Sequence, residues 1–400
     1  MTACAALLGA GLAAATPASA APSVVSAVGR QRGLAPGVGY RDVSLTASQG
    51  RVNGHLVTVD LRNPRVSVDL LHGTSVTDRQ PVSALADGQG AVAGVNGDFF
   101  NIDETHPGIE PTGSSDGPEI AAGRQLKAAV PDGQRFGPAL PVGTGTRDVI
   151  GVGVDRRARL DTLTLKGAAL TTRGVLPLGG LNQYAVPQNG VGAYTSDWGT
   201  VSRARAACGS DTVRADPCTP DAYEVAVRGG RVVSGSARLG SGAIARGTTV
   251  LVGRERGADA LRRLRPGTPV HLSYRLAARH PVPLRFAVGG FPVLRGGAPL
   301  PGLDDATAAT RTAAGLGDHG RRLYLFALDG AAEDSAGLTV AELARVMRDF
   351  GADDAVNLDG GGSTTLVTRA PGAGHVTVRN HPGGIAERPV PNGIGVFARR

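Results

Sequence analysis

Three apolar segments of this 400-residue chain end in the same way, in an Asn or Asp followed by Gly. The apolar runs have the length of buried strands, and the residue pairs that follow them are typical of tight turns. Ligands of open α/β sheets bind outside the carboxyl ends of strands, so three ends with one layout predict a functional site. The three ends are Asn96-Gly97, Asp329-Gly330 and Asp359-Gly360.

The last of these strands runs into three glycines and then into hydroxyl side chains. Gly360, Gly361 and Gly362 expose backbone N–H groups with no side chains in the way. Ser363 and Thr364 follow directly and add hydroxyl donors. The segment therefore predicts a cradle for an oxyanion or a phosphate.

A helix is predicted between the second and third of these strands. Thr339 and Glu342 form a capping-box pair, and apolar residues recur at helical spacing up to Gly351. A strand, a helix and a strand of these lengths predict two parallel strands joined by a right-handed crossover. Asp329 and Asp359 would then share one rim of the sheet, where two carboxylates can divide acid and base roles.

The remaining pattern is rich in short strands and predicts an α+β or mixed α/β fold of twisted mixed sheets. Alternating residues predict a hairpin that turns at Asn63-Pro64, and a single strand over residues 286–294. A strand-rich middle subdomain is predicted at about 150–280, within one domain over residues 39–400.

The N-terminus resembles a secretory signal peptide over residues 1–20, although it lacks a positively charged first segment. An apolar core precedes the A-x-A pattern Ala18-Ser19-Ala20, and residues 21–38 are predicted to be loose. No later stretch is apolar for long enough to span a bilayer. The chain is therefore predicted to be secreted, with no stable membrane insertion.

The cysteines fit the same compartment. Cys4 would leave with the signal peptide, so Cys208 and Cys218 remain. An even pair in a loop rich in Pro and Asp predicts a disulfide formed in an oxidising compartment. A metal-binding pair would need a closer spacing and further ligands that the sequence does not offer.

The net charge of +8 comes from arginines scattered along the chain. Nucleic-acid binding would predict a basic stripe or interleaved aromatic residues, and the sequence has neither. The charge favours an anionic extracellular partner, such as an anionic cell-wall polymer.

Several motifs carry little weight. Residues 113–117 satisfy the G-x-S-x-G pattern of hydrolases, but no strand precedes them and no helix follows, so the match is interpreted as chance. There is no Walker A, EF-hand or H-E-x-x-H motif. His55 is interpreted as a surface or strand residue, whereas His319 and His381 lie near the predicted site loops.

Six motifs occur in the order in which the phosphodiester glycosidase family has them, and the chain resembles that family over nearly its whole mature length. The resemblance implies hydrolysis of the bond between the anomeric carbon of a sugar and a phosphodiester, which releases a free sugar and a phosphomonoester. Asp98 stands where many members have Gly, and Ala314 where Ile is usual. The motifs span residues 94–100, 289–294, 311–315, 328–330, 357–365 and 387–393.

This chemistry needs an anion clamp and at least one carboxylate. Arg311 offers a planar fork that suits a phosphate. Asp359, Asp329 and Glu387 are the catalytic candidates, although the dipeptide Glu387-Arg388 could equally form a local surface ion pair. The predicted substrate- and phosphate-binding residues are Asn96, Gly97, Asp98, Arg311, Thr312, Gly360, Gly361, Gly362, Ser363, Thr364 and Asn392.

No cofactor is required for this chemistry, although Asp98 could hold Ca²⁺ or Mg²⁺ at its Gly-rich strand end. Two alternative functions stay open. One is a metal-dependent phosphodiesterase that cuts at phosphorus, and the other is a non-catalytic extracellular glycan-binding protein. The aromatic content of 4% disfavours the second, because sugar-binding surfaces usually display aromatic rings.

Overall fold

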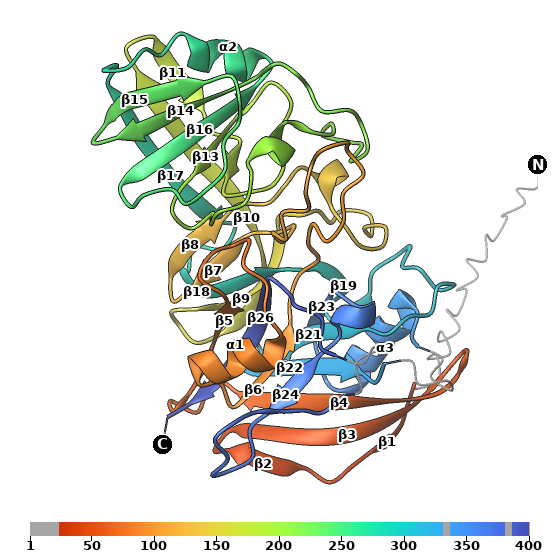
Figure 1. Cartoon of the computed structure of the whole chain (residues 1–400). Coiled ribbons are helices and arrows are strands. Elements are labelled where there is room, and N and C mark those ends of the chain that lie inside the picture. The colour runs from red at the N-terminus through yellow and green to blue at the C-terminus, as the bar shows by residue number, and fades with distance from the viewer. Residues whose placement is uncertain (1–23, 331–336, 381–385, 400) are drawn as a thin grey trace, which may run out of the picture.

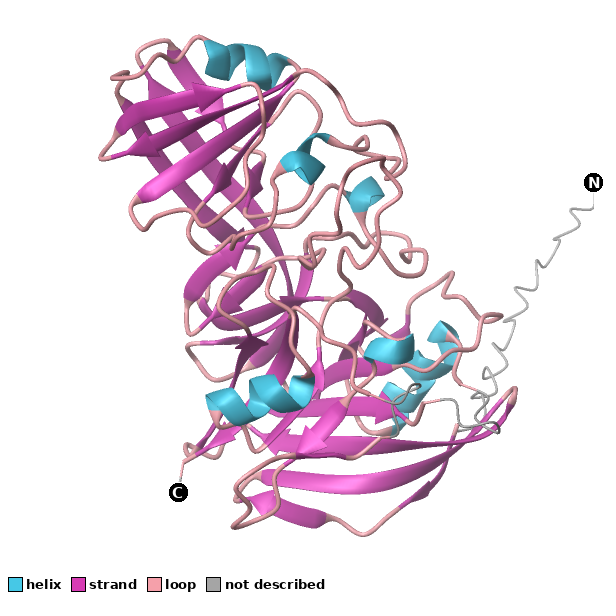
Figure 2. Ribbon diagram, viewed as in Figure 1, coloured by secondary structure: helices cyan, strands magenta, loops and turns pink. Residues whose placement is uncertain are grey.

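The computed structural model describes residues 24–330, 337–380 and 386–399 (Figure 1). Strands dominate this part of the chain and helices are few and short, so the strand-rich α+β class holds (Figure 2). The predicted signal peptide and His381 lie outside the described residues. The helices are α1 (Val82–Gln89), α2 (Arg256–Arg262) and α3 (Val340–Asp349), with 3-10 turns at Asp132–Gln134, Ala204–Ala207 and Gly361–Ser363.

A nine-stranded sheet forms the lower part of the molecule in Figure 1. Its order is β1-β3-β4-β22-β21-β23-β19-β20, with β2 beside β3, and its neighbouring strands are antiparallel. The bounds are β1 (Val25–Val28), β2 (Arg32–Ala35), β3 (Val38–Ala47), β4 (Gly50–Asp60), β19 (Phe291–Arg295), β20 (Ala298–Pro299), β21 (Thr312–Gly317), β22 (Arg322–Leu328) and β23 (Asp354–Leu358).

A five-stranded sheet and α3 pack against opposite faces of the central strands β21 and β22. On one face, Thr312 of β21 bonds to Asn96 of the second sheet. On the other face, Phe326 packs against Phe350 at the end of α3, with ring centroids 5.4 Å apart. This double burial explains why β22 is apolar along most of its length. The second sheet contains β5 (Val66–His72), β6 (Ala93–Asn96), β24 (Leu366–Thr368), β25 (Thr377–Val378) and β26 (Asn392–Ala398).

Two further sheets build the upper part of the molecule (Figure 1). They share an apolar cluster of their own, separate from the main core. The seven-stranded sheet contains β7 (Glu119–Ala121), β8 (Arg124–Lys127), β9 (Asp148–Gly153), β10 (Ala158–Thr171), β11 (Gly174–Pro177), β17 (Val270–Ala278) and β18 (Leu284–Gly289). The other contains β12 (Gly180–Leu181), β13 (Val191–Tyr194), β14 (Ala222–Arg228), β15 (Arg231–Ser236) and β16 (Thr248–Arg254).

Two predicted elements are wrong. The strands on either side of Asn63-Pro64 do not form a hairpin, because β4 pairs with β3 and β22 whereas β5 pairs with β26 of the other sheet. Residues 286–294 are not one strand, because β18 and β19 lie in different sheets and the chain changes sheet at Gly289-Gly290. Both segments are apolar enough to be strands, and only the tertiary structure decides their partners.

The helix between β22 and β23 begins as predicted. Thr339 Oγ1 accepts from the Glu342 N–H (3.1 Å), and Glu342 Oε2 accepts from the Thr339 N–H (2.9 Å). However, β22 and β23 are not neighbours, since β21 lies between them and is antiparallel to both. The two strands therefore run in the same direction without a parallel hydrogen-bonded pair between them.

The segment predicted to be loose is partly ordered, because β1 and β2 form the edge of the nine-stranded sheet within it. Among the described residues, no helix is both long and apolar enough to cross a membrane.

Candidate active site

Asn96, at the end of β6, ties two of the three predicted strand ends together, its own and that at Asp359. Its Nδ2 donates to the carbonyl of Asp359 (2.7 Å), and its Oδ1 accepts from Thr312 Oγ1 (2.9 Å) and from the Thr365 N–H (3.1 Å). The Asp359 N–H donates in turn to the carbonyl of Gly97 (2.9 Å). The structure therefore brings these residues together, and the Asn96 amide acts as a buried cross-link between two sheets.

Asp359 stands directly after β23 and is only partly exposed. Its Oδ1 accepts from the Gly360 N–H (2.9 Å). Burial raises the pKa of Asp359 to about 7, against the opposing effects of the Ser363 hydroxyl and the Arg388 charge, and the negative charge of Asp116 adds to the rise. A carboxyl that titrates near neutral pH can exchange a proton under ordinary conditions.

The glycine loop after Asp359 is tightly folded. The Gly361 N–H donates to the Thr310 carbonyl (2.8 Å), and the Gly360 N–H is already held by Asp359. Gly361 has a φ of 57°, in the left-handed region that favours glycine. Two of the three glycine amides thus have internal acceptors, so the cradle predicted from the sequence is narrower than an open row of donors.

Arg388 is a site residue that the sequence analysis did not select. It is exposed, its Nη1 donates to Ser363 Oγ (3.2 Å), and its charge lowers the pKa of Asp359. A Cβ on Gly362 would lie 2.6 Å from Arg388 Nη2, so glycine at 362 lets the guanidinium lie against the loop. The signal in the sequence was the motif at 387–393, which places Arg388 beside a candidate carboxylate.

Glu387 bonds to the backbone of α1. Its Oε2 accepts from the Ser83 N–H (3.0 Å) in the first turn of α1. A carboxylate at this position accepts from an N–H group that has no acceptor within the helix, and its negative charge interacts favourably with the positive end of the helix dipole. The structure thus gives Glu387 a stabilising contact, and a catalytic role for it stays a prediction.

Arg311, predicted to clamp phosphate, is 6% exposed and bonds to backbone carbonyls. Its Nε donates to Leu338 (2.9 Å) and its Nη2 to Thr307 (2.8 Å). Burial lowers its pKa, opposed by the charge of Asp304. These bonds join the start of β21 to the segment before α3, so Arg311 makes a structural contact on the rim. Its role as a phosphate clamp stays a prediction.

Asp98 belongs to a buried carboxyl cluster next to this rim. Burial, followed by the charge of Asp116, raises the pKa of Asp98 to about 8. Burial also raises the pKa of Asp116 to about 6, although its carboxylate accepts from the Phe136 N–H (2.7 Å) and the Tyr184 hydroxyl (2.8 Å). Asp116 lies in residues 113–117, which are buried throughout despite their polar sequence. Sequence alone could not show that burial.

The environment of Asp98 resembles that of a structural carboxyl. Its Oδ2 accepts from the Gly117 N–H (2.6 Å), and a Cβ on Gly289 would lie 2.2 Å from the same oxygen. The buried Lys127 lies near enough to lower the pKa of Asp98, so a protein cation already acts on the carboxyl. A Ca²⁺ or Mg²⁺ ion at Asp98 stays a prediction.

Asn392 joins the same cluster. Its Oδ1 accepts from the Asp98 N–H (2.9 Å), and its Nδ2 donates to Glu119 Oε1 (2.8 Å). Both ends of the Asn392 amide are therefore used within the protein, as those of Asn96 are.

Asp329 stands after β22 and contacts a histidine. Its Oδ1 lies 2.9 Å from His55 Nε2, and the Asp329 side chain is 16% exposed. The His55 Nδ1 lies 2.7 Å from the Tyr40 hydroxyl, which donates to Asp42 Oδ1 (2.5 Å). His55 was interpreted from the sequence as a surface or strand residue, but it contacts a candidate catalytic carboxylate. The contact was not predictable, because the partners of His55 lie on strands far apart in the sequence.

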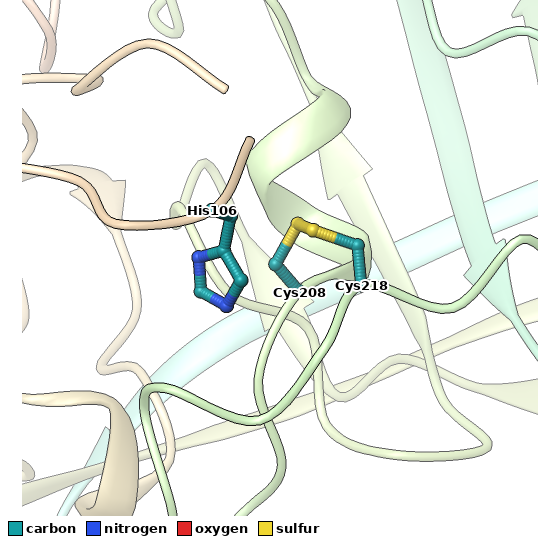
Figure 3. Close-up of side chains that lie close together, drawn as sticks. All are labelled: His106, Cys208 and Cys218. Carbon is teal, nitrogen blue, oxygen red and sulfur yellow. A yellow bond between two sulfur atoms is a disulfide. The ribbon is translucent and has the colours of Figure 1, made fainter. Parts of the chain in front are cut away.

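The predicted disulfide joins Cys208 and Cys218. His106 lies beside it, so that one histidine and two cysteines cluster closely (Figure 3). The sulfurs are bonded to each other, and His106 bonds to Glu104 (2.5 Å) and to the Asp216 carbonyl (2.8 Å). The cluster is therefore a loop closed by a disulfide, next to a buried histidine whose ring nitrogens both have protein partners.

His319 is not at the site, contrary to prediction. It lies in the turn from β21 to β22, at the opposite end of these strands from Thr312 and Leu328. Five cavities lie elsewhere on the described part of the chain, and Asp359 lines none of them. The rim at Asp359 is instead open to solvent at Gly361 and Arg388.

Comparison with protein families adds an independent result. Residues 221–397 match the family described as phosphodiester glycosidase, which confirms the resemblance predicted from the motifs and supports a glycosidase-type hydrolase. The match includes Arg311, Asp329 and Asp359, whereas Asn96 precedes it. No curated protein sequence matches this chain.

Two solved structures share the fold. A hypothetical protein from Synechocystis is 21% identical, with a TM-score of 0.71 over 95% of this chain, which spans 64% of the length of that protein. A Burkholderia pseudomallei protein, provisionally described as exported, is 19% identical, with a TM-score of 0.70 over 96% of this chain and 99% of the other. These identities show the fold alone.

A third structure is less similar. The catalytic domain of zebrafish N-acetylglucosamine-1-phosphodiester α-N-acetylglucosaminidase is 16% identical, over 93% of this chain and 87% of that one. Its TM-score is 0.45.

Proposed function

We propose that this chain, in which residues 221–397 match the phosphodiester glycosidase family, is a secreted hydrolase that cleaves a sugar-1-phosphodiester at the anomeric carbon. The products would be a free sugar and a phosphomonoester. The observation that supports this most is the setting of Asp359, a carboxyl with a pKa of about 7 between a glycine loop and the exposed Arg388.

Asp359 supplies the main chemical requirement of the reaction. A phosphate monoester is a good leaving group, so the reaction depends less on a strong general acid than ordinary glycoside hydrolysis does. It needs a carboxylate that attacks or stabilises the oxocarbenium-like centre, or that activates water. Above pH 7 Asp359 is largely ionised, and its raised pKa makes it a better base than an ordinary aspartate.

Arg388 is the better placed of the two arginines for the phosphate. It is exposed and lies at the glycine loop, whereas Arg311 is buried with two of its donor nitrogens on backbone carbonyls. A guanidinium binds a phosphate oxygen pair with two parallel hydrogen bonds. Arg388, which Ser363 Oγ helps to position, would hold the leaving phosphate, and Arg311 would fix the rim behind it.

Asp329 is the second carboxylate of the proposed site. It follows β22, which lies two strands away from β23, so the strand axes are roughly 10 Å apart. A carboxyl on the same rim suits a second proton-transfer role, with Asp359 nearer the reacting carbon.

Hydrolysis in ¹⁸O-enriched water tests the cleaved bond. A glycosidase places the label in the sugar, whereas a phosphodiesterase places it in the phosphate. Label in the phosphate, together with loss of activity in EDTA, would establish the metal-dependent phosphodiesterase instead. Asp359→Asn serves as the control for background hydrolysis, and a panel of sugar-1-phosphodiesters identifies the sugar.

The partner we propose is an anionic glycan that carries such phosphodiesters, such as a cell-wall polymer, in keeping with the net charge of +8. Tight binding of that polymer with no turnover of any substrate in the panel would favour the non-catalytic glycan-binding alternative. Detection of the chain in the culture medium, without residues 1–20, tests secretion.

A further inference from the structure

A line of four side chains crosses three strands of the nine-stranded sheet and ends at Asp329. Asp42 and Tyr40 lie on β3, His55 lies on β4, and Asp329 follows β22. Asp42 pairs in register with His55, which pairs in register with Ala327 of β22. Residues that face each other across antiparallel strands point to the same face, so the line runs along one face of the sheet.

The contacts along the line are short and continuous. Tyr40 Oη lies 2.5 Å from Asp42 Oδ1 and 2.7 Å from His55 Nδ1, and His55 Nε2 lies 2.9 Å from Asp329 Oδ1. Tyr40 is 2% exposed and His55 8%, whereas the Asp42 side chain is 47% exposed. The line therefore joins a solvent-accessible carboxylate to one on the rim of the candidate site through two buried, proton-carrying groups.

We infer that Tyr40 and His55 relay protons between bulk solvent at Asp42 and the carboxyl of Asp329. This role rests on the proposed function, in which Asp329 exchanges a proton during the reaction. Tyr40 and His55 are then positioning and proton-transfer residues behind a catalytic carboxylate, and neither needs to touch the substrate.

The proton balance closes along the line. When Asp329 has given up a proton, the N–H at His55 Nε2 passes its proton to Asp329 Oδ1. The Tyr40 hydroxyl, which donates to Asp42 at rest, turns to His55 Nδ1 and gives up its proton there. The Tyr40 oxygen then takes a proton from Asp42, once solvent has protonated that carboxylate. Asp42 is then a carboxylate again, so one proton enters at Asp42 for each one delivered to Asp329, and no group gains net charge.

The charges around the relay set its resting state. Against the opposing effect of burial, the hydrogen bond from Tyr40 and the charge of Arg32 lower the pKa of Asp42, so Asp42 is a carboxylate at rest and carries the relayed proton only transiently. Arg32 bonds to Asp42 (2.5 Å), and its guanidinium also lies 5.4 Å from the centre of the Tyr40 ring. Arg379 lies 5.4 Å from the same ring, on the side of the second sheet. Burial and the hydrogen bond to Asp42 raise the pKa of Tyr40, so the phenol keeps its proton and is a bridge rather than a separate base.

Tyr40→Phe tests the relay, because it removes the hydroxyl and keeps the ring. We expect kcat to fall about 10- to 100-fold, within the range of general acid–base effects. The solvent deuterium isotope effect on kcat should also change, and the pH dependence of kcat should shift relative to wild type. Tyr324→Phe is the matched control, since Tyr324 is a buried tyrosine on β22 whose side chain is on the other face of the sheet.

Two further variants separate failure of the relay from failure of the proposed function. If Asp329→Asn keeps full activity, the catalytic assignment of Asp329 is wrong and the relay falls with it. If Asp329→Asn is inactive while Tyr40→Phe keeps the wild-type kcat, pH profile and isotope effect, the relay alone is overturned and the line is only a structural network.

The state of His55 gives a readout that does not depend on turnover. Nitrogen-15 NMR of the imidazole should show the proton on Nε2 in wild type, and a changed Nδ1 signal in Tyr40→Phe. If Tyr40→Phe unfolds, Asp42→Asn replaces it, because it interrupts the same line at an exposed residue. An unchanged isotope effect in a folded Asp42→Asn would contradict the relay.

Discussion

Asp359 and Asp329 end two strands with the same local sequence pattern, yet their surroundings differ. Asp359 lies near a second buried carboxyl, Asp116, and burial raises its pKa to about 7. Asp329 instead bonds to His55, which connects it to an exposed carboxylate. The pattern of an apolar strand followed by Asp-Gly therefore places a carboxyl on the rim, and only its neighbours decide how that carboxyl handles protons.

Replacing each carboxyl by its amide should give the largest effect. We expect Asp359→Asn to lower kcat by several orders of magnitude and Asp329→Asn by about 10²-fold, because Asp359 adjoins the phosphate donors. Steady-state kinetics and thermal unfolding of both variants measure this. A fully active, well-folded Asp359→Asn would remove the end of β23 as the reaction centre.

Arginine-to-lysine exchange should separate the two arginines on the rim. Arg388→Lys should lower kcat/KM about 10- to 100-fold with little change in Tm, because an ammonium cannot make a bidentate phosphate contact. Arg311→Lys should lower both turnover and Tm, since Arg311 also bridges two backbone carbonyls. Wild-type kinetics for Arg388→Lys would mean that Arg311 is the residue that binds the phosphate. Wild-type kinetics for Arg311→Lys would mean that Arg311 has a structural role alone.

The pH dependence of turnover should report on Asp359. With a pKa of about 7 and a role as base or nucleophile, activity should fall about tenfold for each pH unit below 7. A rate that instead rises as the pH drops through 7 would show that Asp359 acts as the acid. The pH–rate profile of Asp329→Asn, measured at its residual activity, assigns the fall in rate below pH 7. If the fall persists in this variant, it belongs to Asp359.

The stability of the protein should depend on pH in the same range. Folding raises the pKa values of Asp116, Asp359 and Asp98 to about 6, 7 and 8 from ordinary aspartate values, so the folded state binds more protons than the unfolded state from about pH 4 to 8. These three groups should therefore make the free energy of unfolding decline as the pH rises through that window. Urea unfolding at several pH values measures it.

Asp359→Asn should flatten that decline, because the amide does not ionise. The variant should equal wild type near pH 5 and be more stable at pH 8. Equal slopes for wild type and Asp359→Asn would mean that Asp359 ionises normally in the fold.

Loss of the disulfide should have the smallest effect on the site, and it should not discriminate between the two carboxyls. The loop that Cys208 and Cys218 close is short, so its removal should cost roughly 2–3 kcal/mol of stability and leave kcat nearly unchanged. Unfolding and kinetics of Cys208→Ser/Cys218→Ser check this. A large loss of kcat would show that the loop supports the rim.

Local signals in the sequence were reliable wherever the interaction is local. The capping box at Thr339 and Glu342 and the disulfide each depend on residues close together in the chain, and the structure contains both. Asn96 and Asp359 were also predicted to meet, from the layout that their strand ends share, although their strands lie in two different sheets.

Partners far apart in the sequence were not predictable. Periodicity shows that a segment is a strand but carries no information about which strand lies beside it, so the turn at Asn63-Pro64 was misread as a hairpin. For the same reason β21 was not expected between β22 and β23. Residues 113–117 are buried because other sheets pack over them. Their polar sequence alone predicts an exposed loop.

The sequence by itself determined that carboxyls, glycines and hydroxyls gather at strand ends, because turn chemistry and burial of apolar runs are local properties. The tertiary structure decided which of those groups is ionised and which is a cross-link. Ionisation depends on desolvation and on charges brought from other strands, as Asp116 acts on Asp359 and His55 bonds to Asp329. Those distances exist only after the sheets have packed.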